Sequence, residues 1–350
     1  MDQQYTRRLE KIEQELNRWL PGEQLAVGNE QGTAFSWAEK VFAGSASPYH
    51  GILTGPCRDL LMRGGKRWRP LLMALVCETL GGGDAAVPLA PLVEFCHNAS
   101  LIHDDIEDSS DERRGKPAVH LIYGIDAAIN SGSFLYFLPL ACIESWAEQR
   151  DAGMAAGIYA LWGKYMRKLH LGQAMDIHWH RNPGAIPTVD EYLAMCALKT
   201  GCLARFAAEL GAAVAGIAGN RPSGMIPLRN FGEAAEKLGI GFQILDDVKN
   251  LTTGLPGKKR GDDIVEGKKS LPVLLYLHRD PEKIKMVSRC FSAAGSGGVN
   301  VPEVEELIQL LLAGGTIAEA EKRGRNLIAE AGAVFSAAGP LLAGFTGLIA

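Results

Sequence analysis

The sequence predicts an all-α protein that folds as one domain over residues 1–350. Apolar residues recur with the spacing of amphipathic helices, while the strict alternation of strands is nearly absent. Short breaks rich in Gly and Pro, such as LPG at 20–22 and GGG at 81–83, separate the periodic stretches. The sequence contains no repeat, no low-complexity tail and no linker long enough to divide domains. We therefore expect long central helices wrapped by shorter ones.

The periodic stretches place the helices, and local signals refine their ends. Thr188 followed by Glu191 predicts an N-terminal capping box. The segment AAGSGGVN, residues 293–300, predicts a flexible surface loop. Residues 331–350 carry no charge but contain Pro340, so we expect a pair of short packed helices, with a membrane anchor as the alternative. The expected helices cover residues 3–19, 35–44, 52–63, 67–80, 86–107, 117–130, 132–147, 152–180, 188–218, 223–251, 268–278, 283–291, 302–313 and 315–338.

Composition limits the class of protein. With 47% hydrophobic and 22% charged residues, the chain can build a large core. Its net charge of −4 excludes a basic protein that coats nucleic acid. Seven scattered cysteines without a C-x-x-C pair indicate buried reduced thiols. The N-terminal stretch MDQQYTRRLEKIEQEL predicts a charged amphipathic helix and not a signal peptide.

An acidic cluster ends the apolar stretch that begins near residue 86. In LIHDDIEDSSDERRGKPAVH, residues 101–120, helical geometry places Asp104 and Asp108 on one face with Asp105 near it. Carboxylates at this spacing repel each other and need a compensating cation. Oxygen ligands without cysteine suit Mg²⁺ or Mn²⁺. A solvated acidic helix end is the alternative.

A second acidic cluster repeats this spacing. The stretch GFQILDDVKNL carries Asp246, Asp247 and Asn250 at positions i, i+1 and i+4, again after an apolar run. The following GDDIVEGKKS adds further carboxylates. Each cluster favours the metal interpretation of the other, and we expect the two to face each other across a cavity.

Basic residues accompany both acidic clusters. A helix is predicted to begin at GGKRWRP, and helix N-termini and Arg forks both suit phosphate oxygens. Any one of these bases alone is an ordinary surface residue, but the set follows both clusters. Metal-binding acids beside phosphate-binding bases predict a diphosphate substrate bridged by Mg²⁺. The bases are Lys66, Arg67, Arg69, Arg113, Arg114, Lys199, Lys258, Lys268 and Lys269.

These motifs, in this order, resemble those of the trans-isoprenyl diphosphate synthases, also called polyprenyl synthetases. The resemblance covers about residues 50–280 and rests on GGKRWRP, EFCHNASLIHDDIEDSSDERRGKPAVH, GQAMDI, KTG, GFQILDDVKNL and GDDIVEGKKSLP. The chain is most similar to geranylgeranyl diphosphate synthases of the fungal and animal type, which share HNASL, an Asn ending the second cluster, and YF after NS. This implies the isoprenoid synthase fold, a bundle of long helices around a central cavity.

The resemblance also implies a reaction, in which isopentenyl diphosphate is condensed head to tail with an allylic diphosphate, geranyl or farnesyl. Loss of the allylic diphosphate leaves a carbocation, and positive charge placed at the leaving group lowers the barrier. Implied metal ligands, for three Mg²⁺ with Mn²⁺ as the alternative, are Asp104, Asp105, Asp108, Asp246, Asp247 and Asn250. Implied contacts of the allylic diphosphate are Arg113, Lys199 and Lys258. Lys268, which also follows the second acidic cluster, is a further expected substrate-binding residue. Implied contacts of isopentenyl diphosphate are Lys66, Arg69, His97 and Arg114.

Two further polar residues and five chain-length residues complete the expected site. Thr200 and Gln243 would lie beside the cation, although Gln243 also suits a packing amide. Ala99 and Ser100 are small and would leave the tail path open beyond fifteen carbons, and Tyr136, Phe137 and His170 match floor positions of the C20 members. An aromatic pair also suits ordinary core packing. We expect geranylgeranyl diphosphate, C20, with C15 or C25 and longer products as alternatives.

Three other functions stay open. A terpene cyclase shares the fold and the first cluster but would lack Lys66 and Arg69. A non-catalytic partner subunit of a synthase usually loses an acidic cluster, and both are present here. A metal phosphohydrolase is suggested by His103 and Asp104, but needs several suitably spaced His ligands. The resemblance further implies a cytoplasmic homodimer with no integral membrane span and no nucleic-acid partner.

Overall fold

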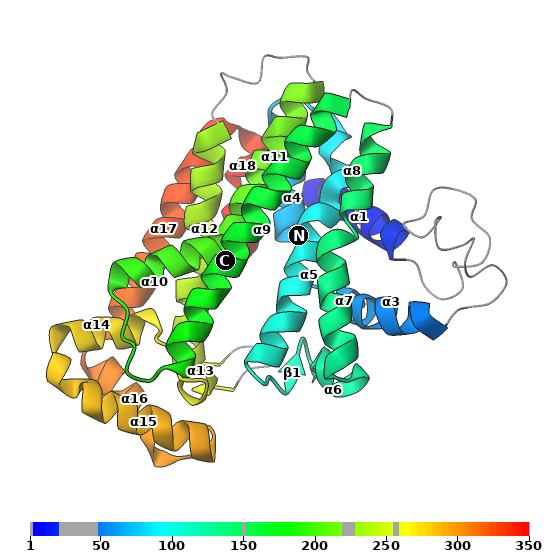
Figure 1. Cartoon of the computed structure of the whole chain (residues 1–350). Coiled ribbons are helices and arrows are strands. Elements are labelled where there is room, and N and C mark those ends of the chain that lie inside the picture. Colours follow the sequence, from blue (N-terminus) through cyan, green and yellow to red (C-terminus); the bar gives the residue numbers. More distant parts are fainter. Residues whose placement is uncertain (1–2, 21–47, 149–151, 219–227, 255–258, 350) are drawn as a thin grey trace. The chain divides into compact units, whose positions relative to one another are not determined.

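The prediction of an all-α protein is confirmed. A computed structural model describes residues 3–20, 48–148, 152–218, 228–254 and 259–349. Within these residues the chain is almost entirely helical, with one two-stranded antiparallel hairpin (Figure 1). The elements up to the hairpin are α1 (Gln3–Trp19), α3 (Pro48–Met62), α4 (Trp68–Thr79), the 3₁₀ helix η2 (Gly83–Leu89), α5 (Ala90–Glu107), β1 (Glu112–Arg113) and β2 (Lys116–Pro117).

Helices of very different length follow the hairpin. The next elements are α6 (Val119–Tyr123), α7 (Ile125–Phe137), α8 (Leu140–Ala147), α9 (Ala152–Arg181), α10 (Val189–Cys196), the π-helical turn η3 (Ala197–Gly201), α11 (Cys202–Ala218) and α12 (Leu228–Thr252). The last are α13 (Asp262–Val265), α14 (Leu271–Arg279), the 3₁₀ turn η4 (Pro281–Lys283), α15 (Ile284–Gly297), α16 (Pro302–Ala313), α17 (Thr316–Ala338), α18 (Pro340–Ala343) and α19 (Phe345–Ile349).

These elements form two compact units. The first unit comprises Met1–Lys164, Phe206–Phe231 and Ala338–Ile349, and the second comprises Tyr165–Arg205, Gly232–Ala337 and Ala350. Each unit is built from segments that are far apart in the sequence. The single-domain organisation stays a prediction.

Helix α5 is central to the core of the first unit. Pro91 lies in its first turn, where the missing N–H costs no hydrogen bond. Nearly all of its residues as far as Ile102 are buried, including the polar Glu94 and Asn98, so the helix lies between neighbours and not on the surface. It packs against α7 and α4, and Figure 1 shows α7 running beside it. Its acidic C-terminal end is therefore held on a rigid element.

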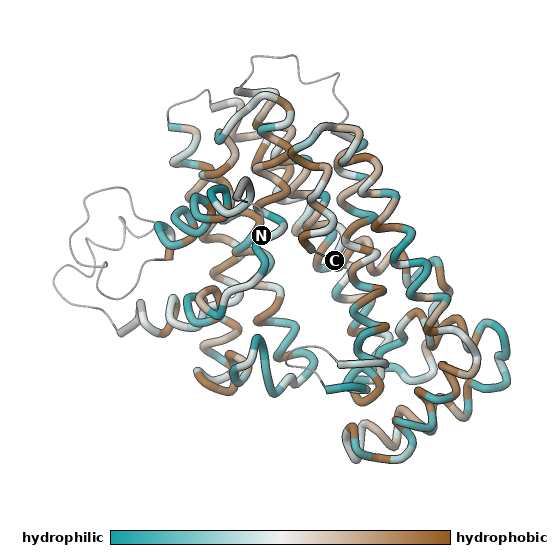
Figure 2. Tube along the Cα trace, turned by 180° about the vertical axis from the view of Figure 1, so that it is seen from behind, coloured by the Kyte–Doolittle hydropathy of each residue, from teal (hydrophilic) through white to brown (hydrophobic). Residues whose placement is uncertain are grey.

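The second unit has its own core. Leucines of α14 and α16 pack with apolar residues of α12 and α15. Helices α12 and α17 approach closely at two glycines. A Cβ added at Gly241 of α12 would lie only 2.7 Å from the carbonyl oxygen of Gly324 of α17. Figure 1 shows α15 and α16 side by side, and Figure 2 shows hydrophobic and hydrophilic stretches alternating along the individual helices. This alternation is expected when each helix buries one face.

Two predicted boundaries near residue 130 are wrong. We predicted a break between 130 and 132, but Ser131 and Gly132 lie inside α7 and are buried. Gly132 is a packing residue, since a Cβ there would lie 2.6 Å from Nε2 of His103. The helix breaks instead at Gly124, whose φ of +90° is one that L residues rarely adopt.

Other expectations had mixed outcomes. The capping box of Thr188 and Glu191 is confirmed, as is the pair of short helices after residue 331, α18 and α19. The loop predicted at 293–300 is wrong in its first half, because α15 continues to Gly297 and ends where Gly298 takes a φ of +75°. Ala294 is buried in that last stretch, and packing extends the helix. The helix predicted at 35–44 lies outside the described residues.

Two stretches of the described chain are long and apolar enough to cross a membrane by length and composition. The first is Gly83–Glu107, whose most apolar 18-residue window is 72% buried within the chain. The second is Ile125–Ala147, whose corresponding window is 44% buried. Core helices meet the same criterion. The uncharged stretch that begins at residue 331 is not among them.

Candidate active site

The first acidic cluster lies at the C-terminal end of α5. Asp104 is about four-fifths buried, Asp105 is fully buried, and Asp108 is the residue that caps the helix. Asp104 and Asp108 share a face of the helix, as their spacing requires. Carboxylates at a helix C-terminus oppose its dipole, so this arrangement costs free energy unless cations compensate for it.

Arg113 supplies part of that compensation. Its Nε donates to Oδ1 of Asp105 at 2.8 Å, its Nη2 donates to the same oxygen, and its Nη2 lies 3.5 Å from Oδ2 of Asp104. Burial raises the pKa of Asp105 above its usual value, while Arg113 acts in the opposite direction. Oδ2 of Asp105 is buried without a hydrogen-bond partner. Such an oxygen has lone pairs to offer a cation.

A cationic cavity lies at the GGKRWRP motif of the first unit. It encloses about 210 Å³, and four cationic side chains and one carboxylate line it. The imbalance of charge suits an anion, and Arg forks suit phosphate oxygens in particular. The lining residues are Gly65, Lys66, Arg67, Trp68, Arg69, Glu94, His97 and Arg114. All four residues predicted to bind isopentenyl diphosphate are among them.

His97 and Arg69 are oriented toward each other in this cavity. Nη1 of Arg69 can only donate, so Nε2 of His97 accepts from it at 3.3 Å and the ring proton resides on Nδ1. Burial, with Arg69 and Arg114 nearby, lowers the pKa of His97 well below its usual value. His97 is therefore a neutral polar group at neutral pH. Arg69 also stacks on Trp68, with its guanidinium carbon 4.4 Å from the ring centre.

Two guanidinium groups cap the C-terminus of α3. Nη1 of Arg114 donates to the carbonyls of Leu60 (3.2 Å) and Gly64, and Nη2 of Arg67 donates to Leu61 (2.6 Å). Leu60 and Leu61 lie in the last turn of α3 and Gly64 follows it, so both cations lie at the helix C-terminus, where the dipole favours positive charge. Burial lowers the pKa of Arg114 to about 10, with repulsion from neighbouring arginines adding to the effect. The cavity is thus built on the end of a helix.

Among the described lining residues Glu94 is the one carboxylate, and it joins the two arginines. Its Oε1 accepts from Nη1 of Arg67 at 2.8 Å and from Nδ2 of Asn98 at 3.1 Å. Oδ1 of Asn98 in turn accepts from Arg114 at 3.3 Å. Arg67 also donates to Glu13 of α1 at 2.7 Å. Arg67 therefore has a structural role, and Glu94 and Asn98 are site residues that the sequence reasoning missed.

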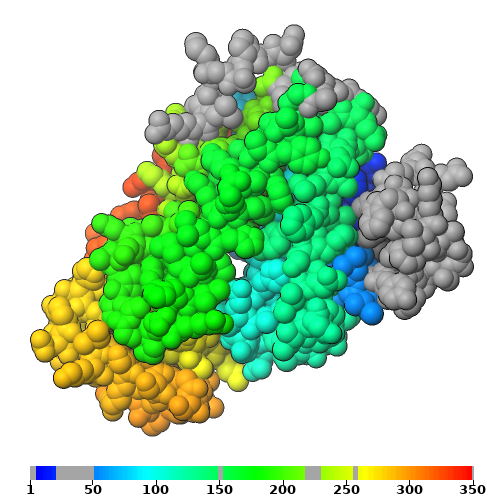
Figure 3. All heavy atoms as spheres, in the orientation of Figure 1, coloured from blue at the N-terminus to red at the C-terminus, as the bar shows by residue number. Residues whose placement is uncertain are grey.

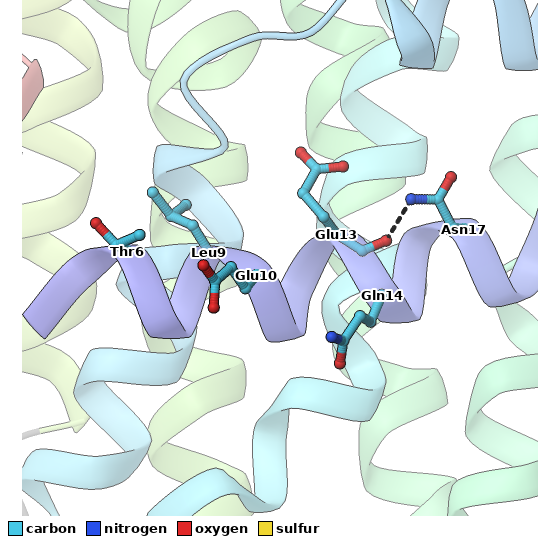
Figure 4. A pocket seen from close by; sticks show the side chains of 6 residues that line it. All are labelled: Thr6, Leu9, Glu10, Glu13, Gln14 and Asn17. Carbon is cyan, nitrogen blue, oxygen red and sulfur yellow. Dashed lines mark hydrogen bonds between the residues drawn. The ribbon is translucent and has the colours of Figure 1, made fainter. Parts of the chain in front are cut away.

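A larger cavity has a different character. It is an open depression of about 590 Å³ along α1, and the described residues that line it are Thr6, Leu9, Glu10, Glu13, Gln14 and Asn17, all from that helix (Figure 4). The ionisable side chains among these described residues, Glu10 and Glu13, are carboxylates, which repel a diphosphate. Figure 4 shows Asn17 bonded to the backbone carbonyl of Glu13, one turn earlier. This cavity does not suit the predicted substrates.

The second acidic cluster lies on α12 in the second unit. Asp246 is exposed, whereas Asp247 is buried. Oδ2 of Asp247 accepts from the hydroxyl of Tyr192 at 2.6 Å, and Oδ1 accepts from Nε2 of Gln243 at 3.0 Å. Burial raises the pKa of Asp247 to about 7, and the nearby charge of Asp263 adds to the shift. That the two clusters face each other across a cavity stays a prediction.

The amide of Asn250, which ends this cluster, contacts the backbone of the segment that follows α12. Its Oδ1 accepts from the backbone N–H of Asp263 at 3.1 Å, and its Nδ2 lies 3.5 Å from the carbonyl of Lys259. An aspartate could not supply the donor. Asn250 is fully buried and holds the segment that leads into α13. Its amide is thus engaged with the backbone.

Lys199 and Thr200 lie on the π-helical turn η3, which interrupts what the sequence predicted as one continuous helix. Nζ of Lys199 donates to Oδ2 of Asp176 at 2.6 Å, and Oγ1 of Thr200 donates to Oε1 of Gln243 at 2.7 Å. Turns of this kind are frequent at functional sites. The sequence reasoning missed Asp176 and Tyr192, because both are fixed by contacts between distant segments.

The remaining predicted bases are Lys258, Lys268 and Lys269, of which Lys268 and Lys269 differ in their contacts and burial. Nζ of Lys268 lies 2.6 Å from Oε2 of Glu266. Lys269 is buried and donates to the carbonyls of Trp179 (3.0 Å) and Gly267 (2.7 Å), so its role is structural. Burial lowers the pKa of Lys269 to about 8. Lys258 lies outside the described residues.

The chain-length candidates divide into buried and exposed residues. Ala99 is fully buried on α5, and Ser100 donates to the carbonyl of His97 at 2.8 Å. Tyr136 is buried, with its ring centre 5.7 Å from that of His103. Phe137 is 60% exposed and packs on Trp162. His170, in the second unit, is also exposed. Of the floor candidates, Tyr136 alone is buried.

The acidic residues suit a hard metal ion. No group of three or more His, Cys, Asp or Glu side chains converges on one point within the described residues. Mg²⁺ in phosphate-processing sites is held by one or two carboxylates together with substrate oxygens, so such convergence is not needed. The donor set is all oxygen, and Asp105 offers a buried oxygen that lacks a hydrogen-bond partner. The residues therefore fit a magnesium ion that a diphosphate completes.

Comparisons with known proteins agree with this chemistry. The polyprenyl synthetase family matches residues 50–311. A geranylgeranyl pyrophosphate synthase of Eremothecium gossypii is 34% identical over 226 residues, which cover 64% of this chain and 68% of that one. A geranylfarnesyl diphosphate synthase of Aeropyrum pernix is 37% identical over 231 residues, covering 63% and 69%.

A solved structure extends the likeness to the whole fold. The crystal structure of a geranylgeranyl pyrophosphate synthetase from Pyrococcus horikoshii Ot3 superposes with a TM-score of 0.75 at 25% identity, and the match covers 99% of each chain. The chain therefore has the all-α isoprenoid synthase fold. Sequence motifs, a cationic cavity and fold agree that it belongs to the polyprenyl synthetase family and is a prenyltransferase that makes prenyl diphosphates.

Proposed function

We propose that this enzyme condenses isopentenyl diphosphate head to tail, twice with geranyl diphosphate or once with farnesyl diphosphate, and releases geranylgeranyl diphosphate, C20. The cationic cavity at GGKRWRP carries the proposal, because it offers a metal-free diphosphate site made of Lys66, Arg69, His97 and Arg114. A terpene cyclase, which binds one diphosphate, has no use for a second such site. Relatives named geranylgeranyl synthases support the product length.

The reaction begins when the C–O bond of the allylic diphosphate breaks and leaves its electron pair on oxygen. The double bond of isopentenyl diphosphate then attacks the cation, a carbon–carbon bond forms, and a proton passes to the departing diphosphate. Arg113 and Lys199 contribute positive charge at the leaving group, which stabilises the transition state. Asp105 and Asp176 are bonded to these two cations and orient them.

Mg²⁺ is the metal that the carboxylates suit, and we propose three such ions. They would be held by the first cluster and by Asp246 and Asp247 of the second, with phosphate oxygens completing their coordination. When bound they would add positive charge to the diphosphate as it leaves. We assign Asn250 to the backbone contacts described above and not to the metal.

Product analysis tests the proposal. The purified chain is incubated with isopentenyl diphosphate and each allylic primer in turn, and the products are sized by mass spectrometry. We expect mainly C20 from both geranyl and farnesyl diphosphate. Mainly C15, or C25 and longer, would contradict the product length. A chain that turns over only with a second protein would instead be the non-catalytic subunit of a synthase.

The same assay on two variants tests which residues set the length. Ala99→Phe should shift the main product toward C15, because a large ring would fill a fully buried small position on α5. Tyr136→Ala should lengthen the product, because it removes the buried ring among the floor candidates. Phe137→Ala, on the exposed neighbour, is the matched control. If Tyr136→Ala leaves the length unchanged, this residue is not the floor.

We also propose a homodimer that works in the cytoplasm. An exposed apolar face on α6 and α7 supports the dimer; it carries Leu121, Ile122, Ile125 and Ile129. Atoms of these helices lie on the surface that Figure 3 shows in blue-green. All seven cysteines are buried thiols outside any disulfide, as expected in a reducing compartment. Analytical ultracentrifugation should give twice the chain mass of 37.6 kDa, and a monomer at micromolar concentration would contradict the dimer.

A further inference from the structure

Arg63 forms a clamp next to the cationic cavity. It directly follows α3, and its side chain is only 1% exposed. Its Nε and Nη2 donate to the two carboxylate oxygens of Asp59, one turn earlier, at 3.2 and 2.7 Å. Its Nη1 donates to the backbone carbonyls of Arg113 (3.0 Å) and Pro117 (2.9 Å). The guanidinium thus ties α3 to a segment 50 residues further along the chain.

The two carbonyls belong to opposite strands of the hairpin. Strand β1 pairs with β2 so that Arg113 is opposite Lys116, with Arg114 and Gly115 between them. These two residues have φ angles of +54° and +75°. Two-residue hairpin turns with both φ values positive favour Asn and Gly. For arginine this left-handed conformation costs about 1–2 kcal/mol.

The hairpin is too short to enforce that conformation by itself. Each strand has two residues, and isolated hairpins are at best marginally stable. A residue in an unfavourable backbone conformation persists only when its surroundings over-determine it. Arg63 provides this constraint by fixing the carbonyl just before Arg114 and the carbonyl of Pro117 on the returning strand.

The conformation matters because of what the turn carries. The guanidinium of Arg114 lines the cationic cavity and caps α3, while that of the preceding Arg113 reaches Asp105. Space for Arg114 is tight, since a Cβ added at Gly65 would lie 3.2 Å from its Nη2. A turn that relaxed to ordinary φ angles would displace both guanidinium groups.

We propose that Arg63, anchored by Asp59, is a positioning residue that holds Arg114 in its left-handed conformation and so sets the affinity of the cationic cavity for isopentenyl diphosphate. This inference rests on the proposed function of that cavity. Arg63 itself donates to a carboxylate and to backbone carbonyls, so it acts through Arg114 and not on the substrate.

A double-mutant cycle on the full-length enzyme tests the inference. We measure KM for isopentenyl diphosphate and kcat in Arg63→Gln, Arg114→Gln and the double variant. Arg63→Gln should raise this KM about 10-fold, which corresponds to about 1.4 kcal/mol. In the Arg114→Gln background the same change should raise it less than about 2-fold, because interacting residues are non-additive. Equal effects in both backgrounds would overturn the inference.

Two further variants separate positioning from general stability. Arg8→Gln is the matched control, because Arg8 also makes a two-bond contact with a carboxylate in the first unit, Glu78, at 2.8 and 2.7 Å. It should lower the melting temperature without changing KM. If Arg63→Gln does not fold, Arg63→Lys keeps the charge but lacks the planar fork, and should raise KM for isopentenyl diphosphate several-fold. An unchanged KM there would overturn the inference.

The same data distinguish failure of the inference from failure of the proposed function. If Arg114→Gln leaves KM for isopentenyl diphosphate unchanged, the cavity is not the isopentenyl diphosphate site, and the inference is overturned together with that assignment. If Arg114→Gln raises KM but Arg63→Gln does not, the assignment holds and the positioning role of Arg63 is wrong.

Discussion

Replacing Asp104 with alanine should lower kcat at least about 100-fold while the chain stays folded. Loss of one group that stabilises developing charge in an enzyme site typically costs about 10²–10³ in kcat. Asp104 is partly exposed at the end of α5, and Nη2 of Arg113 lies 3.5 Å from its Oδ2, so its removal should disturb the core less than removal of a fully buried carboxylate. The measurement is steady-state kcat with saturating substrates over a series of Mg²⁺ concentrations.

Asp104 is a better test of the metal proposal than its neighbour Asp105. The carboxylate of Asp105 is fully buried and bonded to Arg113. Removing one partner of a buried ion pair costs about 3–5 kcal/mol, because the other charge stays buried. An inactive Asp105→Ala chain could therefore be an unfolded chain, and its inactivity would not bear on the metal.

A matched control for Asp104→Ala is Asp111→Asn, which neutralises an exposed acid just after the same helix. It should keep wild-type kcat and the wild-type dependence on Mg²⁺. In Asp104→Ala the Mg²⁺ concentration for half-maximal rate should rise. If Asp104→Ala turns over at the wild-type rate, the proposed metal-assisted departure of diphosphate must be abandoned.

The parts of the site that could be predicted from the sequence are those fixed by local spacing. Asp104 and Asp108 share a face because any helix places i and i+4 together. The capping box of Thr188 and Glu191 depends on four consecutive residues. The bases of GGKRWRP line one cavity because they are close in sequence and follow one helix end.

The parts that could not be predicted depend on contacts between distant segments. Tyr192 and Asp247 are 55 residues apart, and Arg63 reaches carbonyls 50 and 54 residues away. Strands of two residues are too short to show a period of two. The left-handed conformation of Arg114 has no signal in its own side chain, since arginine does not favour it.

The turn η3 was also not predictable from its own residues, because it depends on a contact with a distant segment. Its residues read as ordinary helix, because Ala, Leu and Lys are all good helix formers. What the sequence did contain was a glycine on another helix, Gly172 in the GQAMDI motif. A Cβ there would lie 2.6 Å from the carbonyl carbon of Leu198 and closer still to the backbone nitrogen of Lys199. The glycine allows α9 to touch η3 backbone to backbone.

Gly172→Ala should therefore lower both stability and kcat. The added methyl group meets backbone atoms that cannot rotate away, and overpacking of this kind costs about 1–3 kcal/mol, or more. The same shift would pull Lys199 from Asp176, its partner one turn after Gly172 on α9. Misplacing a catalytic group by 1 Å can cost about 100-fold in rate. We expect a melting temperature several degrees lower and a kcat at least about 10-fold lower.

Gly157→Ala is the matched control, because Gly157 lies on the same helix with nothing within 4 Å of an added Cβ. There the substitution should leave kcat unchanged and stabilise the chain by up to about 1 kcal/mol, since alanine favours helices more than glycine does. Circular dichroism melting and steady-state kinetics on the two variants make the comparison. If Gly172→Ala matched Gly157→Ala in both, α9 and η3 would be free to separate, and the close approach would not be what positions Lys199.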